Sequence, residues 1–308
     1  MPSSYVLAPE WEWLIMLALF AAGVASGTYA IMGLIHFAGD AGDRPVVDRM
    51  GLVPMPFMLI TPVLLTLDLG QPGRFLNLLF TAGGAAERPG PIMFNPNSPM
   101  SWGSWAMILF APFTLVAFLD SIQRLRGVRI PLVGWLSHNI VWLGIGEILA
   151  LATSAYSGVL INVTNQGVWS DTYLMGGLFI AFSELSGIAV AAIVAGMVGN
   201  ARTASGVRTT LFGAALVSAV LLVLFLGNLA TLDARALSAL ATSLLVGPVF
   251  WIGAVGAGLL LPLVTAGPMR LRIWQRTDQL MILGAFVLLG VLAFRYATFF
   301  SAIAFAQR

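Results

Sequence analysis

Apolar residues run along this chain in long, nearly uninterrupted segments, and short polar stretches separate them. A membrane span needs roughly 20 such residues, and we expect helices over about 13–37, 52–68, 102–120, 132–160, 172–198, 209–228, 239–266 and 279–303. The segments do not alternate apolar and polar residues, which favours helices over the strands of a membrane β-barrel. We therefore predict an all-α integral membrane protein, a bundle of about eight transmembrane helices in which residues 1–308 form a single domain.

The arginines are divided unequally between the polar stretches. Those after the first, third, fifth and seventh segments hold Arg44, Arg49, Arg124, Arg126, Arg129, Arg202, Arg208, Arg270, Arg272 and Arg276. The other polar stretches hold Arg74, Arg88, Arg235 and Arg308. Because cytoplasmic loops carry the excess of positive charge, we expect a multi-pass protein of the bacterial inner (cytoplasmic) membrane with both termini on the periplasmic, outer side.

Composition supports the membrane interpretation and excludes some chemistry. Only 9% of the residues are charged, against about a quarter in a soluble domain. The chain has no cysteine, so it cannot hold an iron–sulfur cluster through thiolates, and any such cluster must belong to a partner subunit. The net charge of +2 comes from arginine next to apolar segments, a pattern typical of a membrane surface and not of a nucleic-acid partner.

The polar stretch between the second and third segments is unusual. Residues 69–101 are too rich in proline and glycine for a helix interior, and the stretch is too long for a bare connector. We expect this loop to cap a site at the outer face of the membrane.

Four ionisable residues stand out within predicted spans or at a span end: Glu147, Glu184, Arg295 and Asp68. Each costs roughly 2.5–3.5 kcal/mol on insertion scales, so each needs a physical reason. One reason is packing, through a buried ion pair of Glu147 or Asp68 with Arg295. The other is a proton pathway in which Glu147, Glu184 and Arg295 act together with Ser154.

The predicted fourth span carries a tyrosine near its outer end. His138 and Tyr156 lie 18 residues apart, which is five helical turns and about 27 Å. They therefore fall at opposite membrane surfaces, with Tyr156 level with Asp68. A tyrosine hydroxyl there could donate a hydrogen bond to a quinone carbonyl, and the alternative is an ordinary interfacial tyrosine.

Other cofactor and catalytic motifs are weak or missing from the sequence. His36 and His138 fall near the cytoplasmic surface. A bis-histidine haem between them is geometrically conceivable, but isolated interfacial histidines more often extend towards water. The sequence contains no P-loop, dinucleotide-binding fingerprint or HExxH motif.

Several motifs of the chain resemble those of the NrfD/PsrC family, the integral membrane subunit of polysulfide-reductase-type complexes. Residues 23–29 read G-V-A-S-G-T-Y, similar to the glycine-rich first helix of that family. Residues 68–75 read D-L-G-Q-P-G-R-F and residues 98–103 read S-P-M-S-W-G, which are similar to its loop signatures. Residues 156–160 read Y-S-G-V-L, similar to its Y-x-G-x-L motif.

The resemblance implies a site for menaquinone or ubiquinone at the outer face and no haem in this subunit. It implies a multi-cluster, ferredoxin-like iron–sulfur subunit as partner, and often a molybdopterin catalytic subunit. By position, Tyr156 matches the family's quinone-contacting tyrosine and Asp68 its nearby acidic residue. We expect Arg74, Asn77 and Trp102 in the same quinone-binding loop, where Arg74 and Asn77 order the loop or dock the iron–sulfur subunit.

These observations favour a quinone- or quinol-interacting membrane anchor subunit of a respiratory oxidoreductase complex. It would exchange electrons between membrane quinone and the iron–sulfur subunit, while the chemistry of the terminal substrate lies in another subunit. Two alternatives remain. A secondary transporter would use the mid-membrane glutamates to bind a cation and would purify alone, and a passive anchor would not need those glutamates.

Overall fold

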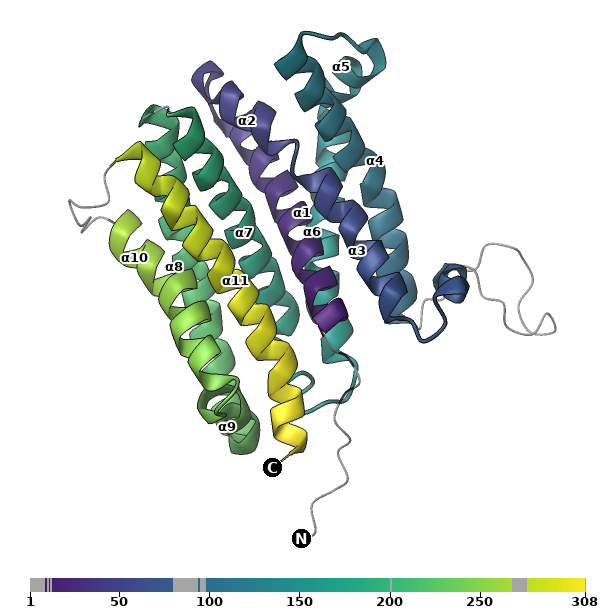
Figure 1. Cartoon of the computed structure of the whole chain (residues 1–308), viewed down its shortest axis with the longest axis vertical. Helices are drawn as coiled ribbons and strands as arrows, with labels where there is room; N and C mark the ends of the chain where they lie inside the picture. Colours follow the sequence, from purple (N-terminus) through teal and green to yellow (C-terminus); the bar gives the residue numbers. More distant parts are fainter. Residues whose placement is uncertain are drawn as a thin grey trace, which may run out of the picture.

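The chain is an elongated bundle of roughly antiparallel helices (Figure 1). The computed structural model describes residues 9, 11, 13–79, 94, 98–199, 201–267 and 276–307, with only the backbone given for 76–78. Within these residues, eight helical segments are long and apolar enough to cross a membrane. The prediction of an eight-span, all-helical membrane protein is therefore confirmed. The segments are Trp13–Ala38, Ala41–Asp68, Pro99–Arg126, Ile140–Asn162, Met175–Val198, Ala201–Leu232, Val249–Ala266 and Thr277–Ala306.

Short helices interrupt or flank several of these spans. In chain order the elements are α1 (Trp13–Ala38), η1 (Ala41–Asp43), α2 (Arg44–Met50), α3 (Pro54–Asp68), η2 (Pro72–Leu78), α4 (Pro99–Arg126), α5 (Pro131–His138), α6 (Ile140–Asn162), α7 (Met175–Val198), α8 (Ala201–Leu232), α9 (Ala234–Thr242), the π-helix η3 (Val249–Leu260), α10 (Leu261–Ala266) and α11 (Thr277–Ala306).

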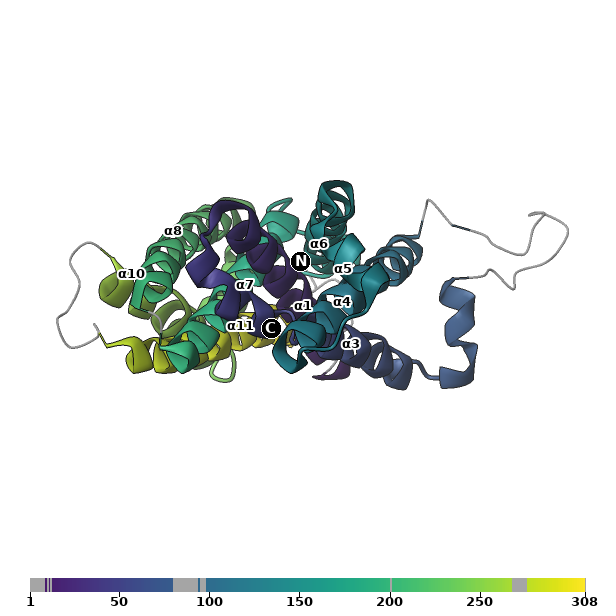
Figure 2. The same cartoon turned by 90° about the horizontal axis from the view of Figure 1, so that it is seen from above.

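The helices form two groups that meet at α1 and α7. Seen from above, α3, α4, α5 and α6 lie on one side, and α8, α10 and α11 lie on the other (Figure 2). Helix α1 packs against α3, α6 and α7, and α7 packs against α8 and α11 as well. Of the eight membrane-crossing segments, α1 and α7 are also the most buried along their most apolar stretches.

Glycines bring α1 and α7 into backbone contact. A methyl group on Gly27 would overlap the carbonyl of Ser183, and one on Gly187 would overlap the carbonyl of Gly27. The matching Ser-Gly pairs at 26–27 and 186–187 thus meet at one crossing. Because lipid is as apolar as the side chains, helices in a membrane associate mainly through close packing, which small residues permit.

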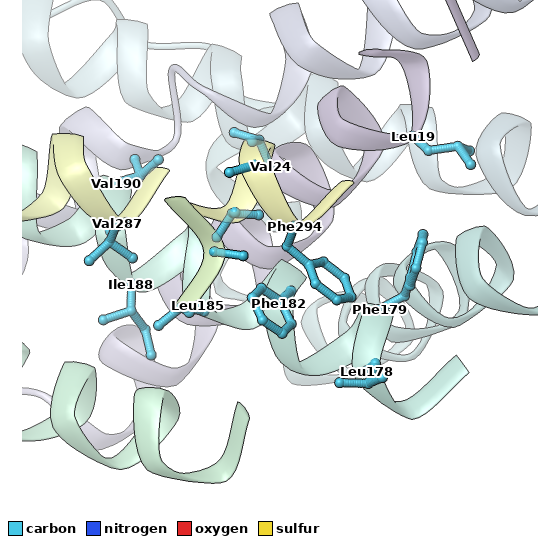
Figure 3. Close-up of a cluster of buried hydrophobic side chains, with 14 of the residues drawn as sticks. Leu19, Val24, Leu178, Phe179, Phe182, Leu185, Ile188, Val190, Val287 and Phe294 are labelled. Atoms are coloured by element: carbon cyan, nitrogen blue, oxygen red, sulfur yellow. The ribbon is translucent and has the colours of Figure 1, made fainter. Parts of the chain in front are cut away.

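Aromatic rings fill the contact between α7 and α11. Phe182 and Phe294 stack with ring centroids 3.8 Å apart and planes 8° apart, and Phe179 lies 5.8 Å from Phe294. Figure 3 shows these three rings together, with Leu185 on the same helix as Phe182 and Phe179. Stacked rings of this kind add to the packing energy of the core.

The expected fourth span, 132–160, is wrong in its boundaries. The chain breaks at Asn139, whose extended backbone separates α5 from α6 and whose side-chain oxygen accepts hydrogen bonds from the amides of Val141 and Trp142 at 3.0 and 3.1 Å. Asparagine is one of the best residues for capping a helix N-terminus. His138 therefore ends α5, and the assumption that it shares one helix with Tyr156 does not hold.

The expected seventh span, 239–266, is also divided. Helix α9 ends at Thr242, and a membrane-crossing helix starts again only at Val249, after Gly247 and Pro248. The new helix is wound as a π-helix, and its Gly258 lies against Gly290 of α11. The interruption covers residues 243–246, and Gly247 and Pro248 are already helical, in keeping with the preference of proline for the start of a helix.

Ten arginines follow the first, third, fifth and seventh predicted spans. Those within the described residues gather at one end of the bundle, where α1 ends and α11 begins (Figure 1). We call this end the arginine-rich face. The opposite face holds the start of α1, the end of α11 and the start of the 69–101 loop, whose residues 80–93 and 95–97 lie outside the described residues. That the arginine-rich face meets the cytoplasm stays a prediction.

Candidate functional site

Tyr156 sits at the opposite face, in the last two turns of α6, against the start of α4. Ser98 caps α4 by accepting a hydrogen bond from the amide of Ser101, and Pro99 follows as the first helical residue, both common at helix starts. One turn later, Gly103 leaves space for the half-buried Tyr156 ring, which a methyl group there would overlap. Among the described residues, no hydrogen bond holds the Tyr156 hydroxyl.

The other expected loop residues are partly described. Asp68 ends α3 and is half-buried. Arg74 is exposed on η2, while the side chain of Asn77 lies outside the described residues. Trp102 is exposed, and its ring centroid is 4.5 Å from that of Phe94. All four belong to the opposite face, as does Tyr156.

An apolar groove of about 240 Å³ runs between α3 and α4 beside these residues. Its lining includes three methionines of α3 and α4 (Met55, Met58 and Met107) and Phe75 of η2. Ser104, next to Gly103, also lines it. An apolar trough beside a few polar groups fits an amphipathic ligand with an aliphatic tail, and methionine adapts readily to such ligands.

Ser154 forms a buried polar link between α1 and α6. Its hydroxyl lies 2.7 Å from that of Ser26, and both side chains are fully buried. Ser26 also donates to the carbonyl of Ala22 one turn earlier. Ser154 thus has a buried hydrogen-bond partner, Ser26, that the sequence did not indicate.

The two expected glutamates come together in the interior. Glu147 of α6 and Glu184 of α7 are close enough for their charges to interact. In each carboxyl group the Oε1 atom is buried and has no hydrogen-bond partner among the described residues. Tyr29 of α1 also lies within electrostatic reach of Glu147. Three helices therefore contribute ionisable groups to one region.

Arg295 of α11 is fully buried. Its Nη2 donates to the Ser183 hydroxyl at 3.0 Å and to the Phe179 carbonyl at 3.5 Å, and its guanidinium carbon lies 3.7 Å from the Phe179 ring centroid. Its Nε and Nη1 atoms have no partner in the described part of the chain. Nor do the described residues provide an ion pair for it, so the expected pair with Glu147 or Asp68 is not found.

The two histidines approach each other at the arginine-rich face, with ring centroids 6.5 Å apart. Both nitrogens of His138 have protein partners: Nδ1 lies 2.7 Å from the Gly134 carbonyl oxygen, and Nε2 lies 3.4 Å from Nη2 of Arg124. His138 therefore makes local contacts with α4 and α5 through both of its ring nitrogens.

Sequence reasoning missed several residues of these sites. Ser26, Tyr29 and Gly103 lie inside motifs that were recognised, but only the helix crossings reveal their partners. Trp169 was missed entirely: it is fully buried in the α6–α7 connection and donates from Nε1 to the Thr298 carbonyl at 2.7 Å. A tryptophan in a short polar connection was the available signal.

Comparison with known proteins agrees with this architecture. The family model described as "Polysulphide reductase, NrfD" matches residues 6–307. The C subunit of polysulfide reductase from Wolinella succinogenes is 24% identical over 307 aligned residues, which cover 93% of this protein and 92% of that subunit. The family match runs through all eight membrane-crossing segments. The chain belongs to the NrfD polysulphide reductase family.

Proposed function

We propose that this chain is the quinone-handling membrane subunit of a respiratory oxidoreductase complex. Its relative is named as one subunit of a polysulfide reductase, and family membership supports an equivalent place for this chain in a reductase complex. The partners would be a multi-cluster iron–sulfur subunit on the opposite face and a molybdopterin or other catalytic subunit that carries the terminal reaction.

Tyr156 carries the proposal. Its ring rests on Gly103, its hydroxyl has no described hydrogen-bond partner, and Ser104 beside Gly103 lines the apolar groove. A menaquinone or ubiquinone would place its aliphatic tail in the groove and its carbonyl at Tyr156. Asp68 would exchange protons with the head group, while Arg74, Asn77 and Trp102 would complete the loop around it.

The interior groups would supply or remove the protons of the quinone reaction. Quinone reduction takes two electrons and two protons, and quinol oxidation releases them. Glu147, Glu184 and Ser154 would pass the protons between helices, and Arg295 would gate them. The contacts that support this role are the approach of the two carboxyl groups and the Ser26–Ser154 hydrogen bond.

The test replaces Tyr156 by Phe and Asp68 by Asn in the assembled complex and measures quinone-coupled turnover. Loss of a hydrogen bond or a proton-exchanging group at the reaction site lowers turnover by about 10²-fold or more. Tyr173→Phe is the matched control, because Tyr173 is 97% exposed in the nearby α6–α7 connection. Wild-type turnover in both Tyr156→Phe and Asp68→Asn would contradict the proposal that quinone reacts at this site. Purification of the chain without cluster-bearing proteins would favour a transporter instead.

A further inference from the structure

A cavity of about 330 Å³ lies between α1, α7 and α8 at the arginine-rich face. Its innermost lining residues are Ile31 of α1, Ile188 of α7 and Thr210 of α8. They lie seven, ten and nine residues from the ends of their helices at that face. At 1.5 Å per residue, the cavity extends about 11–15 Å into the bundle. We call it the α1–α8 groove, and its end at the arginine-rich face the mouth.

The lining of the groove changes from polar to apolar with depth. Arg202 and Thr203 of α8 and Asp43 of η1 lie at the mouth. The aliphatic residues further in include Leu34 and Ile35 of α1, Ile188 of α7 and Val207 of α8. The hydroxyl of Thr210 donates to the Gly206 carbonyl one turn earlier at 3.1 Å, so this polar atom is satisfied within its own helix. A polar mouth above apolar walls matches a ligand that has a polar head and an aliphatic tail.

The groove also opens sideways, towards the surroundings of the bundle. Leu34 on the α1 wall is 51% exposed, and Gly206 and Thr210 on the α8 wall are exposed as well. No atom lies within 4 Å of a methyl group added at Gly206, so the space beside it is open. Because these walls belong to membrane-crossing helices, the side opening faces lipid, and a lipid chain can enter it directly from the bilayer.

The arginine-rich face carries a surplus of positive charge around the mouth. Eight described arginines gather there against five aspartates, a surplus of three. They are Arg44, Arg49, Arg124, Arg126, Arg129, Arg202, Arg208 and Arg276, against Asp40, Asp43, Asp48, Asp120 and Asp278. Each arginine near a membrane surface attracts anionic lipid by about 1 kcal/mol. A zwitterionic lipid and a quinone carry no net charge, so this surplus favours an anionic phospholipid over both.

Arg202 is the basic side chain at the mouth itself. It pairs with Asp40, and the two side chains are 78% and 59% exposed. Exposed ion pairs of this kind contribute only about 0–1 kcal/mol, so a phosphate can compete for the guanidinium. A guanidinium presents five N–H groups in a planar fork, which suits phosphate oxygens. Beside it, Thr203 donates to Asp43 at 2.6 Å and thereby holds η1 against α8.

We propose that the α1–α8 groove binds an anionic glycerophospholipid, with its phosphate at Arg202 and one acyl chain between α1, α7 and α8. Helix α8 packs along α7, while its start is linked to the α1 side by the pairs of Arg202 with Asp40 and of Thr203 with Asp43. The acyl chain continues this link into the membrane and joins the second group of helices to α1. This inference does not depend on the proposed quinone function.

The test measures contact of the protein with brominated lipid chains. Because the sequence has no cysteine, Leu34→Cys gives a single labelling site on the groove wall. Ile148→Cys gives a control site on the outside of α6, where Ile148 is 69% exposed. Each full-length variant carries a bimane fluorophore on the thiol and is held in neutral detergent micelles. Phosphatidylglycerol or phosphatidylcholine with brominated acyl chains is then added, and bromine quenches the fluorophore on contact.

The labelled Leu34→Cys variant should be half-quenched at about fivefold less phosphatidylglycerol than phosphatidylcholine, the ratio that about 1 kcal/mol for one arginine gives. Ile148→Cys should show no preference. Adding Arg202→Gln to Leu34→Cys should abolish the preference. Adding Arg129→Gln should preserve it, because Arg129 is exposed at the same face but outside the groove lining. Equal quenching by both lipids at Leu34→Cys, or a preference that survives Arg202→Gln, would overturn the proposal.

Asp40→Asn separates lipid binding from a purely structural ion pair. Without the Asp40 carboxylate, the lipid phosphate competes with one anion fewer for Arg202, so the preference for phosphatidylglycerol should rise. If the Arg202–Asp40 pair only held the mouth together, Asp40→Asn would lower the preference as Arg202→Gln does. Such a fall would overturn the assignment of the phosphate to Arg202.

A bulky side chain at Gly206 tests the position of the acyl chain. Gly206→Phe fills the groove and should remove most of the quenching of Leu34→Cys by both lipids. Gly213→Phe is the matched control: Gly213 lies seven residues further along the same side of α8, is equally open, and lies beyond the innermost lining residue. It should leave quenching unchanged. Quenching that persists in Gly206→Phe would show that the chain binds elsewhere and would overturn the proposal.

Discussion

The crossing of α1 and α7 gives a sharp prediction for Gly27→Ala. The new methyl group would overlap the carbonyl carbon and oxygen of Ser183. Those atoms belong to a helix backbone, so the only relief is separation of the two helices. Since unstrained carbon contacts lie at about 3.5–4.0 Å, the helices must move apart by roughly 1.5 Å.

The cost follows from what holds these helices together. Gaps of 0.5–1 Å already forfeit roughly a quarter to a half of the dispersion energy of the atoms concerned, and packing is the main attraction between helices in lipid. Overpacking of this kind costs about 1–3 kcal/mol. Gly227→Ala is the control, because Gly227 lies within α8, five residues before its end, with nothing within 4 Å of the added methyl.

The assay is equilibrium unfolding of the purified chain in mixed detergent micelles. Gly27→Ala should lower the free energy of unfolding by about 2–3 kcal/mol, whereas Gly227→Ala should leave it unchanged or raise it by up to about 1 kcal/mol. Gly187→Ala strains the same crossing from the other helix, so the double variant should be less than additive. If Gly27→Ala and Gly227→Ala agreed within about 0.5 kcal/mol, the backbone contact would be refuted.

Three further outcomes are expected. Gly103→Ala should displace the Tyr156 ring and lower quinone-coupled turnover about tenfold or more, while the open Gly213→Ala on α8 should not; equal turnover in both would contradict the Tyr156 placement. Arg295→Met should leave thermal stability equal or higher while impairing coupled turnover, because a buried charge without a counter-charge is costly; a large loss of stability would argue for a structural role. Trp169→Phe should destabilise the α6–α7 connection by about 0.5–1.5 kcal/mol, detected as faster proteolysis there, because the indole hydrogen bond to the Thr298 carbonyl is lost while Ser301 still donates to that carbonyl.

The eight spans were readable from the sequence because each needs only a run of apolar residues of sufficient length. Their interruptions were harder to see. Asn139 splits the fourth expected span, and Gly247-Pro248 precedes the late start of the seventh. Each signal is only one or two residues long, and its effect depends on whether the local backbone finds better hydrogen-bond partners than a continued helix would give.

For the candidate site, too, some residues were readable from the sequence and others only from the fold. The motifs around Asp68, Ser98–Gly103 and Tyr156 identified the loop and its tyrosine, since they are continuous in the sequence. The contact of Gly103 with Tyr156 and the Ser26–Ser154 hydrogen bond each join two different helices. No local sequence pattern therefore indicates them. Their positions within predicted spans pointed to Glu147 and Glu184 as costly residues, but not to their mutual approach.

Arg295 illustrates the limit most clearly. From the sequence, a buried arginine and two buried glutamates invite an ion pair, yet the fold places the guanidinium on Phe179 and Ser183 and leaves the carboxyl groups to each other. Apolar run length, arginine distribution and local motifs determine the membrane-spanning plan of this protein, because each acts within one segment. Which polar groups meet, and where a cavity remains between helices, is decided by tertiary packing, because glycines at crossings such as Gly27–Gly187 set how closely and in what register the helices approach.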